Sequence, residues 1–159
     1  MATDDLFPFD AAVEPNDDVA TELLEQAQSN AQAAIIATVA FLRAEGIPLA
    51  RWTESLGRTF ARGWDEPQPW EAGEFMEAML INLRSLGATI GTTDLGDEHA
   101  EATTTGFPDA DLCALFGVEV DQVARFNDAT AVFARDRGLA WTWTLDGETT
   151  RYTADRTEG

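Results

Sequence analysis

The strongest constraint on the fold of this chain is an Asp-Gly dipeptide, Asp146-Gly147, that lies between two segments of alternating apolar and polar residues. An Asp-Gly pair tolerates the positive φ angles of a type I′ turn, and alternation with a period of two is typical of a half-buried strand. The stretch LAWTWTLDGETTRYTADR, residues 139–156, is therefore predicted to form a β-hairpin. A two-stranded ribbon is not stable alone in water, so the rest of the chain must supply more strands or a layer of helices.

The predicted hairpin has one aromatic face and one polar face. With a two-residue loop at the Asp-Gly pair, Trp141 opposes Tyr152 and Trp143 opposes Thr150. Opposed residues lie on the same side of a sheet, which groups the tryptophans with the tyrosine and leaves mainly threonines on the other side. We expect Trp141 and Trp143 to face a layer of helices.

A second hairpin is predicted within residues 87–106, GATIGTTDLGDEHAEATTTG. A three-residue loop at residues 94–96, with Gly96 in the left-handed conformation, would set Ile90 opposite Ala100. This register collects the apolar residues on one face. It places His99 on the other face, where a histidine is more often a surface residue than a catalyst.

Helical periodicity and end signals predict five helices in the remaining segments. Their expected ranges are Asp17 to Glu45, a helix opened by Pro48, a helix that ends at Gly87, Asp109 to Phe116, and Val120 to Arg137. The order is three helices, a hairpin, two helices and a hairpin, without the crossovers of a parallel sheet. We therefore expect an α+β fold in which the two hairpins form a four-stranded antiparallel sheet covered by helices. Residues 17–156 should form a single domain, preceded by an acidic, partly disordered arm at residues 1–16.

The first helix is apolar over most of its surface. Its expected inner stripe comprises Leu23, Leu24, Ala27, Ala31, Ala34, Ile35, Thr38, Phe41 and Leu42. Its second half, AAIIATVAFL, is apolar nearly all the way round, and Ile36 lies away from that stripe. This surface predicts a homodimer through the first helix, with Ile36 as the diagnostic position.

The chain is strongly acidic. Of its 159 residues, 29 are acidic and 10 are basic, all of them arginine, for a net charge of −19. Such a surface is typical of a cytoplasmic protein adapted to high salt, where screening removes the repulsion between carboxylates. It argues against nucleic acid or an anionic membrane as a partner, since phosphate binding needs a cationic patch. The acidic start also lacks the basic and apolar regions of a signal peptide, which supports a cytoplasmic location.

Few residues in the sequence are suited to catalysis or to metal binding. Cys113 is the only cysteine and His99 the only histidine, so a cysteine-based zinc site and an intrachain disulfide are excluded. We expect no metal and no cofactor. The remaining catalytic candidates are Cys113 as a nucleophile and His99 or a carboxylate as its base.

A buried amide points to a pocket instead. Asn127 falls in the middle of the apolar face of the last helix, where an amide needs a backbone group, a water or a ligand as its partner. The expected pocket lies between the sheet and the first, third and fifth helices. The residues expected to line it are Trp141, Tyr152, Asn127, Phe126, Phe133 and Met79.

The second half of the chain resembles a known group of domains. The run DADLCALFGVEV, the helix DQVARFNDATAVFARDRG and the hairpin LAWTWTLDGETTRY are similar to L-2-amino-thiazoline-4-carboxylic acid hydrolase-like proteins. The order of elements resembles the ligand-binding domains of the 4-vinyl-reductase family, to which that group is related. The resemblance implies an α+β ligand-binding domain, and it carries over Cys113, because a cysteine recurs at this place in such relatives.

Three functions stay open at this point. The first is a small-molecule binding domain with an aromatic-lined pocket. The second is an enzyme that hydrolyses a carbon–nitrogen bond of a small substrate, with Cys113 as nucleophile. The third is a dimeric interaction domain without a ligand. An enzyme needs an accessible, activated thiol, whereas a thiol packed in a core is inert.

Overall fold

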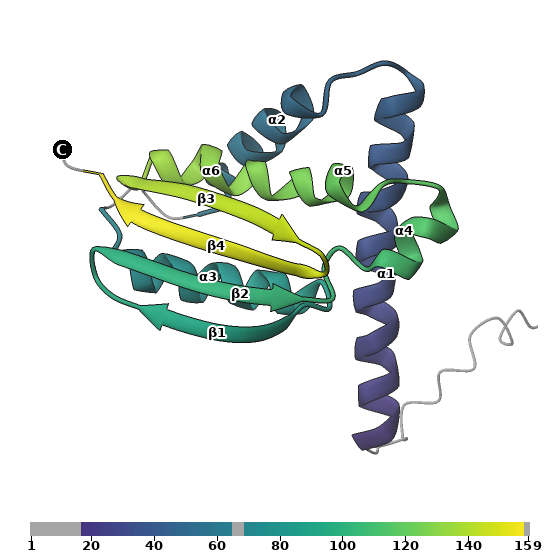
Figure 1. Cartoon of the computed structure of the whole chain (residues 1–159), viewed down its shortest axis with the longest axis horizontal. Helices are drawn as coiled ribbons and strands as arrows, with labels where there is room; N and C mark the ends of the chain where they lie inside the picture. The colour runs from purple at the N-terminus through teal and green to yellow at the C-terminus, as the bar shows by residue number, and fades with distance from the viewer. Residues whose placement is uncertain (1–16, 65–68, 158–159) are drawn as a thin grey trace, which may run out of the picture.

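The centre of the molecule is a four-stranded antiparallel sheet with the strand order β1-β2-β4-β3 (Figure 1). The computed structural model describes residues 17–64 and 69–157. The strands are β1 (Thr89–Leu95), β2 (His99–Thr105), β3 (Leu139–Asp146) and β4 (Thr149–Arg156). Each hairpin contributes one edge strand and one central strand, and the two hairpins meet where β2 pairs with β4. The predicted α+β class and the single four-stranded sheet are confirmed.

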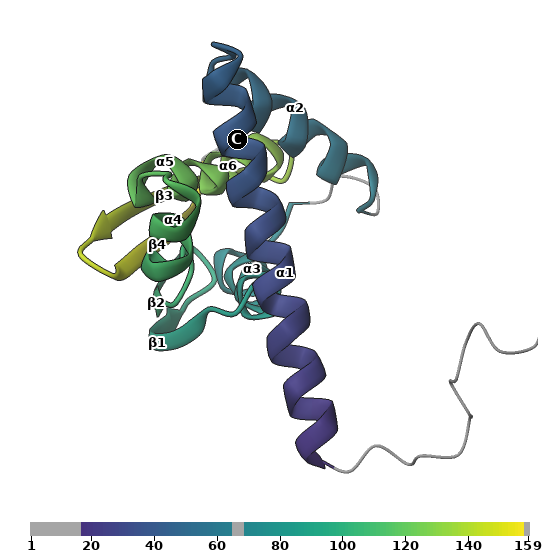
Figure 2. The same ribbon diagram turned by 90° about the vertical axis from the view of Figure 1, so that its right-hand side faces the viewer.

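Helices cover one face of this sheet and one end of it (Figures 1 and 2). They are α1 (Asp17–Ala44), α2 (Leu49–Arg62), α3 (Ala72–Ser85), α4 (Ala110–Phe116), α5 (Val120–Ala124), the 3₁₀ turn η1 (Arg125–Asn127) and α6 (Asp128–Arg135). The sheet is contacted by α3 and α6, α2 packs on α6, and α1 stands at the end of the sheet beside α4 and α5. Among the described residues, no helix combines the length and hydropathy needed to span a membrane.

The core between α3, α6 and the sheet is aromatic. Phe75 is fully buried, and its ring lies 5.4 Å from that of Phe133 and 5.7 Å from that of Trp141. On the sheet, the rings of Trp141 and Tyr152 lie 5.3 Å apart. The prediction that the aromatic face of the last hairpin packs against helices is correct for Trp141, which is buried, and for the half-buried Trp143.

The predicted register of the last hairpin was wrong by two residues. Trp141 pairs with Ala154 and Trp143 with Tyr152, and the strands continue to the pair Asp146 and Thr149. The two turn residues are therefore Gly147 and Glu148, with a positive φ of 60° at the glycine alone. A turn of this kind needs glycine only at its first central position. A slip of two residues leaves each side chain on its expected face.

The register of the first hairpin also differs from the prediction. Leu95 pairs with Ala100, and Ile90 pairs with Thr104 beyond a β-bulge between Ile90 and Thr93. Gly96 does not adopt the left-handed conformation; it follows the strand, and its carbonyl oxygen accepts a hydrogen bond from the amide of Gly73 at the start of α3. The loop is thus displaced toward the C-terminus because α3 docks on it.

The buried face of α1 overlaps the predicted stripe only at its edge, where Leu42 is buried and Ile35 is partly buried. Ile36 and Val39 are fully buried in a second core with Cys113 and Val123, whereas Phe41 of the predicted stripe is 58% exposed. The polar residue Gln32 is buried as well. Its amide joins α1 to the carbonyl oxygens of Leu86 and Gly106 and accepts the amide N–H of Asp109. Ile36 is therefore a core residue and cannot report on an interface.

The predicted last helix is interrupted where Asn127 lies. Its Nδ2 donates to the carbonyl oxygen of Ala124 at 3.0 Å, and the chain makes a 3₁₀ turn between α5 and α6. The expected acidic arm, residues 1–16, lies outside the described residues.

Candidate functional site

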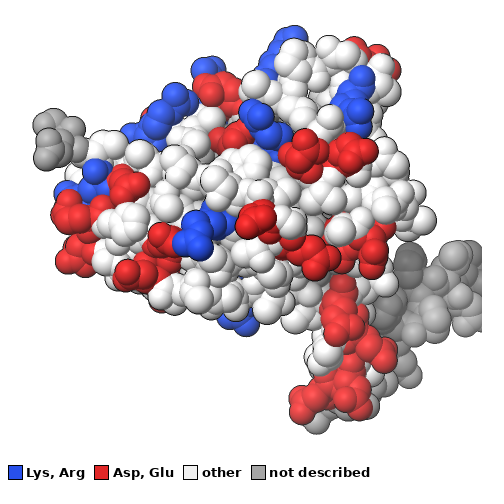
Figure 3. Space-filling model, viewed as in Figure 1, with Lys and Arg blue, Asp and Glu red and all other residues white. Residues whose placement is uncertain are grey.

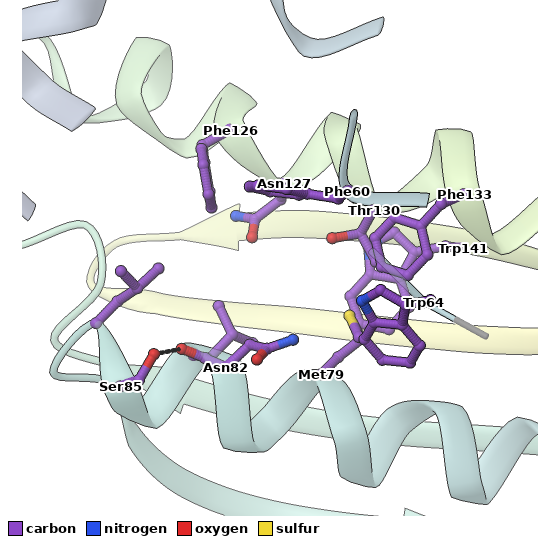
Figure 4. A pocket seen from close by; sticks show the side chains of 12 residues that line it. Phe60, Trp64, Met79, Asn82, Ser85, Phe126, Asn127, Thr130, Phe133 and Trp141 are labelled. Carbon is purple, nitrogen blue, oxygen red and sulfur yellow. Dashed lines mark hydrogen bonds between the residues drawn. The ribbon is translucent and has the colours of Figure 1, made fainter. Parts of the chain in front are cut away.

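A cavity of about 290 Å³ lies between α2, α3 and the segment formed by η1 and α6, above β3 (Figure 4). Its lining residues are Phe60, Trp64, Met79, Asn82, Leu83, Ser85, Leu86, Phe126, Asn127, Thr130, Phe133 and Trp141. Figure 4 shows Asn127, Thr130 and Phe133 extending from the upper helix and Met79 from α3 on the opposite side. Phe60, Asn82 and Ser85 are exposed, so the cavity opens to solvent between α2 and α3.

The inner wall is a set of touching aromatic rings. Trp64 lies 5.5 Å from Phe133 and 5.4 Å from Trp70. Behind this wall the guanidinium of Arg137 stacks at 5.4 Å from the Trp64 ring, and its Nη1 donates to the carbonyl oxygen of Phe133. These contacts hold the wall rigid, because a packed and hydrogen-bonded side chain loses its alternative rotamers on folding.

The two tryptophans of the last hairpin differ in how their indole N–H groups are satisfied. Trp143 Nε1 donates to Asp128 Oδ1 at 2.8 Å. Trp141 Nε1 is buried and has no hydrogen-bond acceptor among the described residues. Trp141 lines the cavity and Trp143 does not. A buried donor without an acceptor is costly, and a ligand acceptor atom in the cavity would satisfy it after a small movement of the Trp141 side chain, because Nε1 itself has no accessible surface.

Asn127 is fixed by protein contacts. Its amide nitrogen donates to the carbonyl oxygen of Ala124, at the turn between α5 and α6. Burial raises the pKa of Tyr152 by more than the hydrogen bond from Thr104 Oγ1 to its hydroxyl and other nearby polar side chains lower it. The tyrosine therefore stays neutral near pH 7, and Asn127 is positioned by its hydrogen bond to the turn.

Five of the six predicted pocket residues come together around this cavity: Trp141, Asn127, Phe126, Phe133 and Met79. Tyr152 does not line it; it lies behind Trp141, against which its ring packs. The first helix was expected to form one wall, but no residue of α1 lines the cavity. That helix packs instead on α4 and α5.

Helix α2 supplies the wall that the sequence prediction missed. Phe60 and Trp64 lie four residues apart, with Phe60 in α2 and Trp64 just after its end, and both line the cavity. Their spacing showed that they share a helix face, but not which element that face would contact. The other missed residues are Asn82, Leu83, Ser85, Leu86 and Thr130.

Among the described residues, no charged side chain lines the cavity. This lining disfavours a charged ligand, because an ion that moves from water into an apolar site without a partner loses solvation free energy that no contact in the site replaces. The polar groups present are hydroxyls, amides and the indole N–H of Trp141. The cavity therefore suits a neutral and mainly apolar compound.

The two catalytic candidates lie in settings that do not support a thiol mechanism. Cys113 is fully buried in the second core, and burial together with the nearby carboxylate of Asp109 raises its pKa. His99 is exposed on β2, where its Nδ1 lies 2.6 Å from Asp155 Oδ1. Neither residue lines the cavity. Among the described residues, no group of three histidine, cysteine or acidic side chains is placed to hold a metal ion.

Comparison with known proteins adds no relative. No protein-family model matches the chain, and no curated protein matches it at a significant level.

Proposed function

We propose that this protein binds a small, neutral, largely aromatic molecule in the cavity between α2, α3 and α6. The observation that carries the proposal is the buried indole N–H of Trp141, which has no acceptor within residues 17–64 and 69–157 and belongs to a cavity whose described lining holds no charged side chain. Binding sites for small molecules are mostly apolar with a few polar groups that fix the orientation of the ligand. The indole N–H of Trp141 and the side-chain amide of Asn127, which is hydrogen-bonded to Ala124, supply such groups.

The volume of the cavity limits the size of the ligand. A dry cavity of about 150 Å³ in another protein accommodates one benzene ring. The cavity of about 290 Å³ therefore suits a compound of roughly two fused rings. A small movement of the Trp141 side chain would let its N–H donate to a hydrogen-bond acceptor on one ring, and the rest of the compound would pack on Trp64, Phe133 and Met79.

The order of helices and hairpins supports the same proposal through the resemblance to ligand-binding domains of the 4-vinyl-reductase group. A carbon–nitrogen hydrolase that uses Cys113 is the weaker alternative, since the thiol is buried and its pKa is raised. A thiol of this kind reacts slowly, because the thiolate is the nucleophile.

The acidic surface supports a further part of the proposal, a cytoplasmic setting at high salt. Figure 3, in the same view as Figure 1, shows acidic side chains spread over the face toward the viewer and along the projecting end of α1. The net charge of −19 would produce strong self-repulsion at low ionic strength. Salt at molar concentration shortens the screening length to about 3 Å and removes most of this repulsion.

The test compares three compounds of similar size by calorimetric titration in molar potassium chloride. Quinoline is neutral and carries one acceptor nitrogen, naphthalene is its hydrocarbon counterpart, and quinoline-2-carboxylate is its anion. We expect quinoline to bind most tightly and naphthalene more weakly, and we expect no binding of quinoline-2-carboxylate. Trp141→Phe should lower the affinity for quinoline about 3- to 10-fold through the loss of one hydrogen bond. The affinity for naphthalene should change much less.

A blocking variant gives the control on location. Asn82 is exposed at the mouth of the cavity, so Asn82→Trp should abolish binding without unfolding the protein. Glu77→Trp, also exposed on α3 but outside the lining, should leave binding unchanged. Tight binding of the anion, or equal affinities in all variants, would refute the proposed site.

A further inference from the structure

Within the described part of the chain, helix α1 leaves one long face without a partner. Figure 2 looks onto this face, which no described element covers, and shows the first half of the helix projecting beyond the sheet. Leu24 is 57% exposed and Phe41 58% exposed. Apolar exposure over the length of a helix is unusual in a monomer and marks a surface that binds something.

The exposed face follows a coiled-coil pattern. Residues spaced alternately by four and three positions form a seam of small or apolar side chains: Ala20, Leu24, Ala27, Ala31, Ala34, Thr38 and Phe41. A second helix packs against a seam with this spacing. Thr38 leaves no unsatisfied hydroxyl there, since its Oγ1 donates to the carbonyl oxygen of Ala34 at 2.8 Å.

We propose that two copies of this chain pair antiparallel along these seams, about a two-fold axis at Ala31. In this register Phe41 lies over the partner's Ala20, and Leu24 lies over the partner's Thr38. The central contacts are then alanine on alanine, so each large side chain meets a small one and the helices remain close along the seam. A parallel pair would set Phe41 on Phe41 and Leu24 on Leu24, which would hold the alanines apart.

The charges of α1 favour the same orientation. Asp17, Asp18, Glu22 and Glu25 are exposed at its first turns, and Arg43 is exposed at its last turn. Among the described residues these five side chains form no ion pair. The antiparallel register keeps the acidic first turns of the two copies at opposite ends of the seam, whereas a parallel register would bring these acidic ends together. Exposed charges contribute little to affinity, so their repulsion selects the orientation and the apolar seam supplies the binding.

The size of the seam predicts a weak dimer. The 28 residues of α1 span about 42 Å, and a contact strip about 10 Å wide covers on the order of 400 Å² on each copy. Stable interfaces bury roughly 800 Å² on each partner. Ile81 of α3, which is 65% exposed and shares a surface groove with Leu24, extends the apolar area beside the seam. We expect a dissociation constant on the order of micromolar.

Sedimentation velocity of the full chain in molar potassium chloride tests the interface. The wild type should convert from monomer to dimer as its concentration rises through the micromolar range. Ala34→Arg should remain monomeric at every concentration, with an unchanged circular dichroism spectrum because Ala34 is exposed. Ser29→Arg, on an exposed face opposite the seam, is the matched control and should dimerise like the wild type.

Oxidative cross-linking tests the orientation. A disulfide needs two α-carbons within about 7 Å, and seven helical residues span about 10 Å. Ala31→Cys should therefore form a disulfide between two copies of the same variant. Ala27→Cys and Ala34→Cys should form a disulfide only with each other, when the two variants are mixed. Cys113 does not interfere, because it is fully buried.

Three results would overturn the proposal: a wild-type monomer at all concentrations, an Ala34→Arg variant that still dimerises, or self-cross-linking of Ala27→Cys. A chain that dimerises only after removal of residues 1–16 would also contradict it, since that segment would then occupy the seam.

Discussion

Gly57 of α2 is the position where the structure makes its sharpest quantitative prediction. The glycine is buried where α2 crosses α6. A Cβ atom added there would lie 2.5 Å from Val132 Cβ and would also collide with the carbonyl oxygen of Ala129. Both neighbours belong to α6, and one of them is backbone, so Gly57→Ala cannot be relieved by rotating a long side chain.

Two opposing effects determine the result of Gly57→Ala. Alanine in a helix interior is favoured over glycine by about 1 kcal/mol. Overpacking of a close contact typically costs about 1 to 3 kcal/mol, and more where the backbone must move. Because Cβ atoms essentially never approach within 3.0 Å, the helices must separate, and we expect the upper part of that cost. The net loss should be about 1 to 2 kcal/mol in the free energy of unfolding.

Urea denaturation in molar potassium chloride measures this difference, with Ser55→Ala as the control. Ser55 is exposed on the same helix, and its replacement should stabilise the protein by a few tenths of a kcal/mol, about 0.5 at most. Phe60 and Trp64 line the cavity from the same segment, so separation of the helices should also weaken ligand binding. A gain of about 1 kcal/mol in Gly57→Ala would refute the close α2–α6 contact and with it the α2 wall of the cavity.

Two further predictions concern charge and the buried thiol. The melting temperature should rise from low to molar potassium chloride, because a net charge of −19 is then screened; a flat curve would contradict adaptation to high salt. Cys113 should react with a disulfide reagent at pH 8 only as fast as the protein unfolds, and fast labelling of the native state would contradict its burial. Because folding raises the pKa of this thiol, it contributes stability below the ordinary thiol pKa, and that stability is lost as the pH rises through its folded value.

The faces of the two hairpins could be predicted from the sequence, but their registers could not. The side-chain period of two assigns Trp141 and Tyr152 to one side whatever the turn, since a slip of two residues preserves it. Asp146-Gly147 and Gly147-Glu148 are both acceptable turn pairs, and only the observed pairing decides between them. In the first hairpin the contact of Gly96 with α3 moves the loop, and such a contact has no local signal.

The buried face of α1 is the clearest failure of sequence reasoning. Nearly every position of its second half is apolar, so periodicity does not show which side is buried. The deciding contacts come from Gln32, whose partners Leu86, Gly106 and Asp109 are 54 to 77 residues away. A polar residue that anchors a helix through distant backbone groups cannot be distinguished from a solvated one by sequence alone.

Five of the twelve residues that line the cavity were predicted, because their place depends on local patterns. The aromatic alternation of β3 pointed to Trp141, and the amide in an apolar face pointed to Asn127. The contribution of α2 depends on its packing across α6 through Gly57, for which a glycine in a helix gives only a weak signal.

The most direct test of a ligand-binding cavity is the titration of quinoline into the wild type and into Asn82→Trp under identical conditions. We expect heat of binding in the wild type, none in Asn82→Trp, and wild-type behaviour in Glu77→Trp. A wild type that binds none of the three compounds, or an Asn82→Trp variant that binds quinoline as the wild type does, would contradict a ligand site bounded by Trp141, Phe60 and Trp64.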